Sequence, residues 1–182
     1  MNFKEYQLNA TRTCADLGSL KLNLSHMILG IISENEEFLK AMVEEDMINA
    51  KEEQCDQMWY IANYCTYRGF DLTEVVGDIN EGLEDFITDD WEGVVPTWDV
   101  FSSKLADYVK KFIAYDKELD EELEKKALKA IVWSLTIEDT GLNFEVDLQK
   151  NIDKLRARFP EKFNTVNALN RDLDKERKIL ES

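Results

Sequence analysis

The chain has few of the residues on which disulfide-rich and thiolate-metal proteins depend. Its 182 residues include three cysteines, Cys14, Cys55 and Cys65, without a Cys-x-x-Cys pair. A disulfide framework or a thiolate zinc site is therefore disfavoured, and we expect reduced, buried thiols. His26 is the single histidine, and a structural or helix-start role is expected for it. Two prolines, seven glycines and almost no alternating β-branched runs predict an all-α fold of long helices.

Positive charge and long apolar runs are also scarce. The chain has 22 Lys and Arg residues against 38 Asp and Glu, a net charge of −16 and a pI near 4.5. Such a surface repels phosphates and anionic lipid, so a nucleic acid polymer is not expected as a partner. No run approaches the ~18 apolar residues that span a bilayer. The charged, polar N-terminus has no apolar stretch behind a basic flank, so we expect no membrane association and a cytoplasmic location.

The spacing of apolar residues predicts eight helices. They are expected at Phe3–Leu17, Ser25–Glu45, Asn49–Tyr67, Leu72–Ile87, Val100–Ala114, Glu121–Glu138, Phe144–Ala157 and Asn164–Leu180. Gly69 is suited to the left-handed cap after the third helix, Asp71 to the N-cap of the fourth, and Pro160 to the end of the seventh.

One stretch of the chain is typical of a connection between packed units. Between Asp78 and Asp99 there are eight acidic residues and no Lys or Arg, together with Gly93 and Pro96. Such a composition favours a solvated segment over a second metal site. We therefore divide a single domain into a catalytic unit (1–88), an acidic connection (89–99) and a second unit (100–182).

The two units share a pattern that indicates an internal repeat. Trp59, Gly69 and Asn80 stand in the first unit, and Trp133, Gly141 and Asn151 follow in the second at similar spacings. We interpret the chain as two fused helical hairpins that form one bundle.

The residues most indicative of chemistry are two acidic pairs, Glu34-x-x-Glu37 and Glu53-x-x-Asp56, separated by fifteen residues. Side chains three apart share a helix face, so antiparallel packing of the two helices would bring four carboxylates together. Oxygen ligands without nearby His or Cys favour Mg²⁺ or Mn²⁺. A di-iron site is disfavoured because it needs Glu-x-x-His motifs. An ordinary solvated acidic face is the alternative, since the chain is rich in Glu.

The same segments resemble a known family. "HMILGIISENEEFLKA" followed by "KEEQCDQMWYIANYC" is similar to the MazG-like, all-α nucleoside triphosphate pyrophosphohydrolases, whose signature is Glu-x-x-Glu, a spacer, then Glu-x-x-Asp. The lead-in Leu29-Gly30-Ile31, the pair Trp59-Tyr60 and the tail "NIDKLRARFPEKF" at residues 151–163 also match the family. The opening "MNFKEYQLNATRT" is similar to phage and bacterial members, which would place a phage-encoded protein in the host cytoplasm.

The resemblance implies hydrolysis of a nucleoside or deoxynucleoside triphosphate to the monophosphate and pyrophosphate. Mg²⁺ held by Glu34, Glu37, Glu53 and Asp56 would activate a water for attack on the α-phosphorus, with Glu37 or Glu53 as the catalytic base. By the same resemblance, nucleotide-binding residues are expected at Tyr60, Asn80, Asn151, Lys154 and Arg158. The sequence does not name the base or the sugar.

In the second unit, Ala127 and Ala130 stand at the positions that match Glu53 and Asp56. We therefore expect a degenerate copy and one active site per chain, in a monomer or a homodimer. Two other functions are compatible with the sequence. The chain could be a non-catalytic nucleotide-binding or regulatory relative, or a helical interaction protein whose acidic face binds a basic partner.

Overall fold

The computed structural model describes residues 1–78 and 98–181, and in this part of the chain the all-α prediction is confirmed. The helices are α1 (Phe3–Thr11), α2 (Leu20–Val43), α3 (Met47–Arg68), α4 (Leu72–Val76), α6 (Trp98–Tyr115), α7 (Glu121–Thr136), α8 (Phe144–Arg158), α9 (Thr165–Leu169) and α10 (Leu173–Glu181). None of these helices combines the length and apolar character needed to cross a bilayer.

The α2–α3 hairpin is the centre of the molecule. Its turn is short: Glu44 caps α2, Glu45 takes a left-handed φ of 58°, and Asp46 accepts a hydrogen bond from the backbone N–H of Asn49 to begin α3. This tight reversal forces the two helices to pack antiparallel along their length. The four predicted carboxylate positions therefore lie on neighbouring helix faces.

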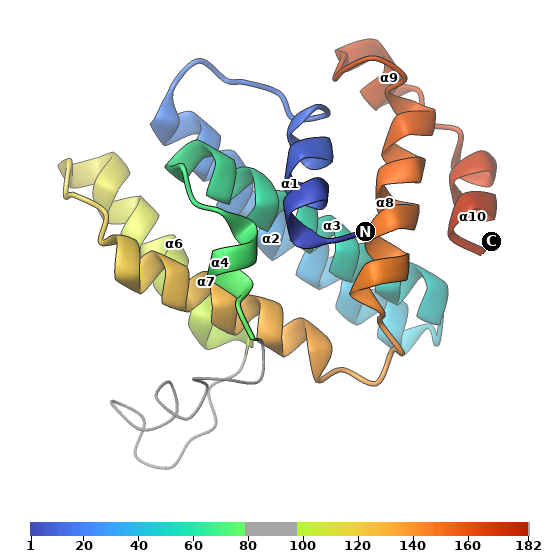
Figure 1. Ribbon diagram of the computed structural model, residues 1–182, viewed down its shortest axis with the longest axis horizontal. Helices are drawn as coiled ribbons and strands as arrows, with labels where there is room; N and C mark the ends of the chain where they lie inside the picture. The colour runs from blue at the N-terminus through green and yellow to red at the C-terminus, as the bar shows by residue number, and fades with distance from the viewer. Residues whose placement is uncertain (79–97, 182) are drawn as a thin grey trace.

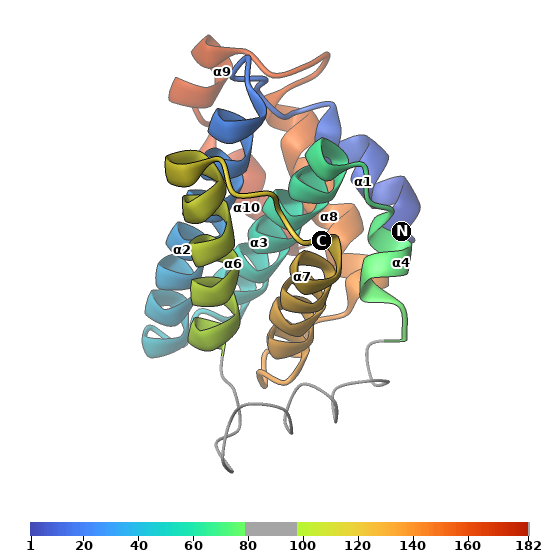
Figure 2. The ribbon, with the colours of Figure 1, turned by 90° about the vertical axis from the view of Figure 1, so that its left-hand side faces the viewer.

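The remaining helices pack around α3 (Figures 1 and 2). In Figure 1, α1 lies in front of the hairpin, α6 and α7 lie to the left and α8 to α10 to the right. α6 packs on α7 and on α2, while α8 packs on α3, α1 and α10. Pairing of α6 with α7 forms a second hairpin. Its origin as a degenerate copy of the first stays a prediction.

One continuous apolar core joins α1, α2, α3, α4, α6, α7 and α8. Leu24 and Met58 from the first hairpin and Leu105 and Leu128 from the second are all fully buried in it. Ala127 and Ala130 are buried in the same core. All three cysteines lie in the described part of the chain and are free thiols, with Cys55 and Cys65 buried and Cys14 half-buried.

Several helix ends match the predicted signals. Gly69 caps α3 with a φ of 72°, and the Asp71 side chain accepts a hydrogen bond from Thr73 N–H at the start of α4. α8 ends at Arg158, two residues before Pro160. These signals act through local backbone geometry, so sequence alone could locate them.

Four predicted helices differ from the structure, three of them in where they begin or end. The first ends at Thr11, well before Leu17, and the second begins at Leu20 because Ser19 provides the N-cap. The helix expected at Leu72–Ile87 ends at Val76, where Gly77 has a positive φ of 54°. The part of that prediction beyond residue 78 lies outside the described residues, as does most of the acidic connection.

The predicted helix Asn164–Leu180 was wrong, because the segment forms two short helices. Asn164 caps α9, and Asp172 accepts a hydrogen bond from Lys175 N–H at the start of α10. Local side-chain capping therefore competes with helix continuation at residues 170–172.

Candidate active site

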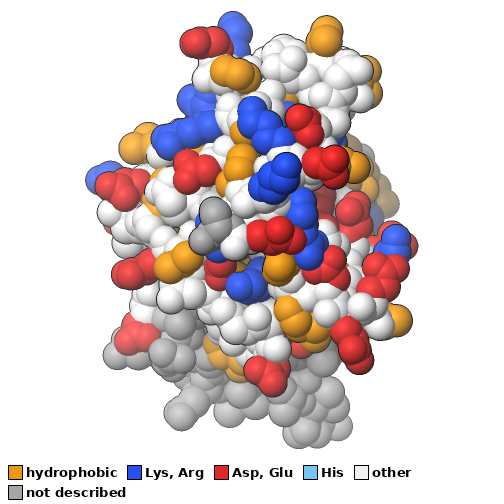
Figure 3. All heavy atoms as spheres, turned by 90° about the vertical axis from the view of Figure 1, so that its right-hand side faces the viewer, with side chains coloured by type: hydrophobic (Ala, Val, Ile, Leu, Met, Phe, Trp, Pro, Cys, Tyr) orange, Lys and Arg blue, Asp and Glu red, His pale blue; other side chains and the backbone are white. Residues whose placement is uncertain are grey.

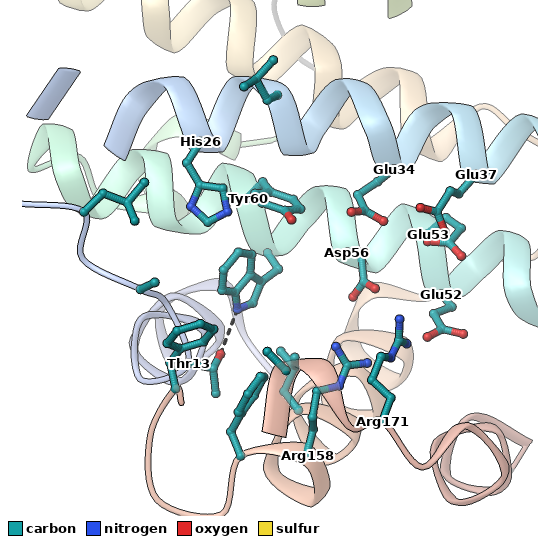
Figure 4. A pocket seen from close by; sticks show the side chains of 18 of the residues that line it. Thr13, His26, Glu34, Glu37, Glu52, Glu53, Asp56, Tyr60, Arg158 and Arg171 are labelled. Atoms are coloured by element: carbon teal, nitrogen blue, oxygen red, sulfur yellow. Dashed lines mark hydrogen bonds between the residues drawn. The ribbon is translucent and has the colours of Figure 1, made fainter. Parts of the chain in front are cut away.

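A cavity of about 750 Å³ opens between α2, α3 and α8. The loop that precedes α2 and the segment that follows α8 complete its walls. Carboxylates lie at one end, aromatic and apolar side chains lie at the other, and two arginines extend from the opposite side (Figure 4). The cavity thus has chemically distinct walls.

The acidic end contains a cluster of three glutamates. Carboxylate oxygens of Glu34, Glu37 and Glu53 lie within 4.8 Å of one another. Glu34 and Glu37 stand one turn apart on α2, whereas Glu53 comes from α3. Packing of the hairpin therefore brings together three of the four carboxylates that the spacing predicted to meet.

This cluster is electrostatically crowded. Burial, reinforced by the negative charge of Asp56, raises the pKa of Glu53 to about 9 and that of Glu34 to about 7. A hydrogen bond joins the two side chains and raises the pKa of Glu53 further. Both carboxyl groups therefore favour the protonated form more than an exposed glutamate does, Glu53 more strongly than Glu34.

Asp56 lines the same cavity but lies outside this group of three. Its carboxylate accepts hydrogen bonds from Lys154 Nζ at 2.8 and 2.7 Å and from Asn151 Nδ2. Asn151 in turn accepts a hydrogen bond from the hydroxyl of Tyr6 at 2.9 Å. A metal ion that takes Asp56 as a ligand would share that carboxylate with Lys154.

Lys154 is fully buried beneath the acidic wall. Its ammonium also donates to Glu52 Oε1 at 2.9 Å. Burial by itself lowers the pKa of Lys154, but attraction to Asp56 and Glu52 outweighs it and leaves the pKa above its ordinary value. Glu52 lines the cavity and was not predicted, because on the sequence it belongs to the general acidic background.

The aromatic end contains Tyr60, Trp59 and His26. Tyr60 packs edge to face against Trp59 at 4.8 Å and against His26 at 5.6 Å between ring centroids. A Cβ at position 30 would lie 2.1 Å from the Tyr60 ring, so Gly30 is needed for the ring to lie flat on α2. Trp59 Nε1 donates to Thr13 Oγ1 at 3.0 Å, which anchors the indole to the segment after α1.

Of the five predicted nucleotide-binding residues, the structure brings Tyr60 and Arg158 to the cavity wall. Asn151 and Lys154 are buried behind the acidic wall, where their side chains hold Asp56. Asn80 lies outside the described residues. Sequence reasoning missed Arg171, whose position depends on the unpredicted break between α9 and α10.

The donor set of the acidic end fits a hard divalent cation. Glu34, Glu37 and Glu53 offer only oxygen ligands. A cation among them would offset the burial and the repulsion that raise the pKa values of Glu34 and Glu53. Asp56 is close enough to influence both titrating glutamates and could serve as a further ligand. Mg²⁺ and Mn²⁺ remain the candidate ions.

Comparisons with family models, with curated proteins and with solved structures give no match to this chain. The likeness to MazG-like pyrophosphohydrolases therefore rests on the motifs of the sequence.

Proposed function

We propose that the chain is a Mg²⁺-dependent nucleoside triphosphate pyrophosphohydrolase, which releases the monophosphate and pyrophosphate. The observation that carries this proposal is the convergence of Glu34, Glu37 and Glu53 in a cavity whose opposite wall contains arginine side chains. A triphosphate needs both a cation site and a basic wall to offset its negative charge.

The residues of the site would have different roles according to their positions. Glu34, Glu37, Glu53 and Asp56 would hold Mg²⁺, which when bound supplies charge neutralisation and lowers the pKa of water. Glu37 is exposed to the cavity and is the candidate general base. Lys154 and Asn151 orient Asp56 from behind.

The aromatic end suits the base of the nucleotide. Tyr60, Trp59 and His26 offer apolar faces and edges there, and a nucleobase gains free energy by stacking on such rings. The carboxylates and the aromatic rings lie at different ends of the cavity (Figure 4). The phosphates and the base of a nucleotide would therefore bind at separate places.

The test is pyrophosphate release from a panel of NTPs and dNTPs, with and without Mg²⁺. We expect metal-dependent release in the native chain, loss of it in Glu53→Gln, and native activity in Glu36→Gln, which removes an exposed carboxylate from the same hairpin. If no nucleotide yields pyrophosphate, the proposed enzymatic activity is refuted. Binding without hydrolysis would then favour the regulatory relative.

A further inference from the structure

We propose that Arg171 is a second phosphate-binding residue beside Arg158, and that Glu176 is the positioning residue that aims both guanidinium groups into the cavity. The identity of the anion rests on the proposed function. The contacts between these three side chains are a property of the structure by itself.

Glu176 accepts hydrogen bonds from the same two nitrogen atoms, Nε and Nη2, of both arginines. Its carboxylate accepts from Nε and Nη2 of Arg158 at 2.9 and 2.5 Å, and from Nε and Nη2 of Arg171 at 3.3 and 2.8 Å. Within residues 1–78 and 98–181, the Nη1 group of each arginine makes no hydrogen bond to the protein. Both guanidinium groups therefore keep a donor edge available to a ligand.

The charges around Glu176 are unequal. One carboxylate that is only 4% exposed faces two guanidinium groups, so the triad has an excess positive charge. Arg158 and Arg171 both line the cavity and extend toward Asp56 and Glu52 at its acidic end (Figure 4). Neither arginine forms a hydrogen bond with Asp56 or Glu52. The cavity therefore separates the arginine wall, formed by Arg158 and Arg171, from the carboxylate wall, formed by Glu34, Glu37, Glu52, Glu53 and Asp56.

An anion that binds a cation on the carboxylate wall and the donors of the arginine wall would fill this space. Guanidinium groups suit phosphate because their planar donors match two phosphate oxygens at once. The C-terminal segment repels an anion less than the rest of the chain does. Residues 144–182 contain nine Lys and Arg against eight Asp and Glu, although the whole chain is strongly acidic. Figure 3 shows Lys and Arg side chains interleaved with Asp and Glu side chains on the face formed by α8 to α10.

The break between α9 and α10 makes the triad possible. In one continuous helix, residues 171 and 176 would point to different faces and could not meet. Because the chain bends at residues 170–172, Arg171 turns back onto α10 and reaches Glu176. The segment after α8 therefore contributes a wall of the site and not only a cover for the core.

The experiment measures binding of inorganic pyrophosphate at excess Mg²⁺, and of Mg²⁺ alone, by titration calorimetry. Arg171→Ala is expected to raise the Kd of pyrophosphate about tenfold, because a charge-assisted hydrogen bond is lost. Arg171→Lys should recover part of the loss. The control Arg156→Ala, an exposed arginine on α8 that contacts Asp153 and Asn9, should leave the Kd unchanged. Mg²⁺ alone should bind all variants equally.

Glu176→Gln separates positioning from simple charge. Removal of a negative charge beside two arginines would by itself tighten anion binding. Positioning predicts the opposite result: weaker pyrophosphate binding, with KM for the best nucleotide rising more than kcat falls. Should Glu176→Gln lose the native unfolding transition, the comparison of Arg171→Ala with Arg171→Lys decides the question.

The two proposals fail in different ways. Hydrolysis that proceeds with the same KM in Arg171→Ala and Arg156→Ala, or tighter anion binding in Glu176→Gln, would overturn the arginine triad and leave the enzyme intact. Pyrophosphate binding that depends on Arg171 in a protein that hydrolyses no nucleotide would support the triad and refute the enzyme.

Discussion

Glu53 is a buried carboxyl group whose surroundings in the folded chain disfavour its ionisation. The side chain is 6% exposed, and burial and the neighbouring carboxylates raise its pKa to about 9 from an ordinary value of 4.5. A carboxyl group whose pKa is raised by folding takes up a proton when the chain folds. Its contribution to stability is complete below pH 4.5 and is lost as the pH rises toward 9.

Glu53→Gln should therefore stabilise the metal-free chain while it abolishes activity. Near pH 8 we expect a gain of about 1–3 kcal/mol in the free energy of unfolding, since the neutral amide avoids the cost of taking up a proton on folding. Near pH 4 the gain should vanish, because Glu53 is protonated in both states. Urea unfolding in EDTA at the two pH values, with Glu36→Gln as control, measures the difference. Equal stability of the native and variant chains at pH 8 would contradict the raised pKa of Glu53 in the folded chain.

Residue-level reasoning from the sequence found the acids of the site more easily than their partners. The pairs Glu34–Glu37 and Glu53–Asp56 were predicted because helical spacing decides which side chains share a face. Capture of Asp56 by Lys154 was not predicted, since these residues are 98 positions apart. Such a contact depends on the packing of α8 against α3.

At the scale of elements, α10 is attached to the hairpin at its turn. Arg177 donates to both oxygens of Asp46, at 2.8 and 3.0 Å, and Lys150 Nζ donates to the carbonyl of Leu180 at 3.0 Å. The same helix carries Glu176. Docking of α10 is therefore coupled to the position of the arginine wall.

Arg177→Ala should loosen α10 selectively. The partners are about one-third exposed, so the loss is expected to be only about 0.5–1 kcal/mol. Amide hydrogen exchange in α10 should then be about two- to fivefold faster, while α2 and α3 stay protected. Lys178→Ala, on the exposed side of the same helix, serves as the control. Unchanged exchange in α10 would show that the Arg177–Asp46 pair contributes little and that the other contacts of the helix, including those of Glu176 and Lys150, hold it in place.

At the scale of the whole molecule, the two hairpins share one core. Leu128 on α7 is fully buried in the same cluster as Leu24 and Met58 of the first hairpin. Units that share a core are expected to unfold together.

Leu128→Ala tests this continuity. We expect a loss of about 2–5 kcal/mol, because removal of a buried side chain leaves a cavity. Urea unfolding followed by tryptophan fluorescence and by far-UV circular dichroism should give coincident transitions, shifted together to lower urea. Leu123→Ala, at a partly exposed position of the same helix, should change little. Two separate transitions would instead indicate hairpins that fold independently.

The sequence by itself determined the all-α class, most helix bounds and the meeting of Glu34 and Glu37 with Glu53, three of the four carboxylates that were expected to cluster. These features depend on periodicity, capping and neighbouring helices joined by a short turn, all of which act over a few residues. Tertiary structure alone decided that Lys154 and Asn151 hold Asp56 from behind, that Glu52 joins the acidic wall, and that Arg171 enters the cavity. Each of these contacts joins segments distant in the chain or requires a helix break, and side-chain spacing contains no information about either.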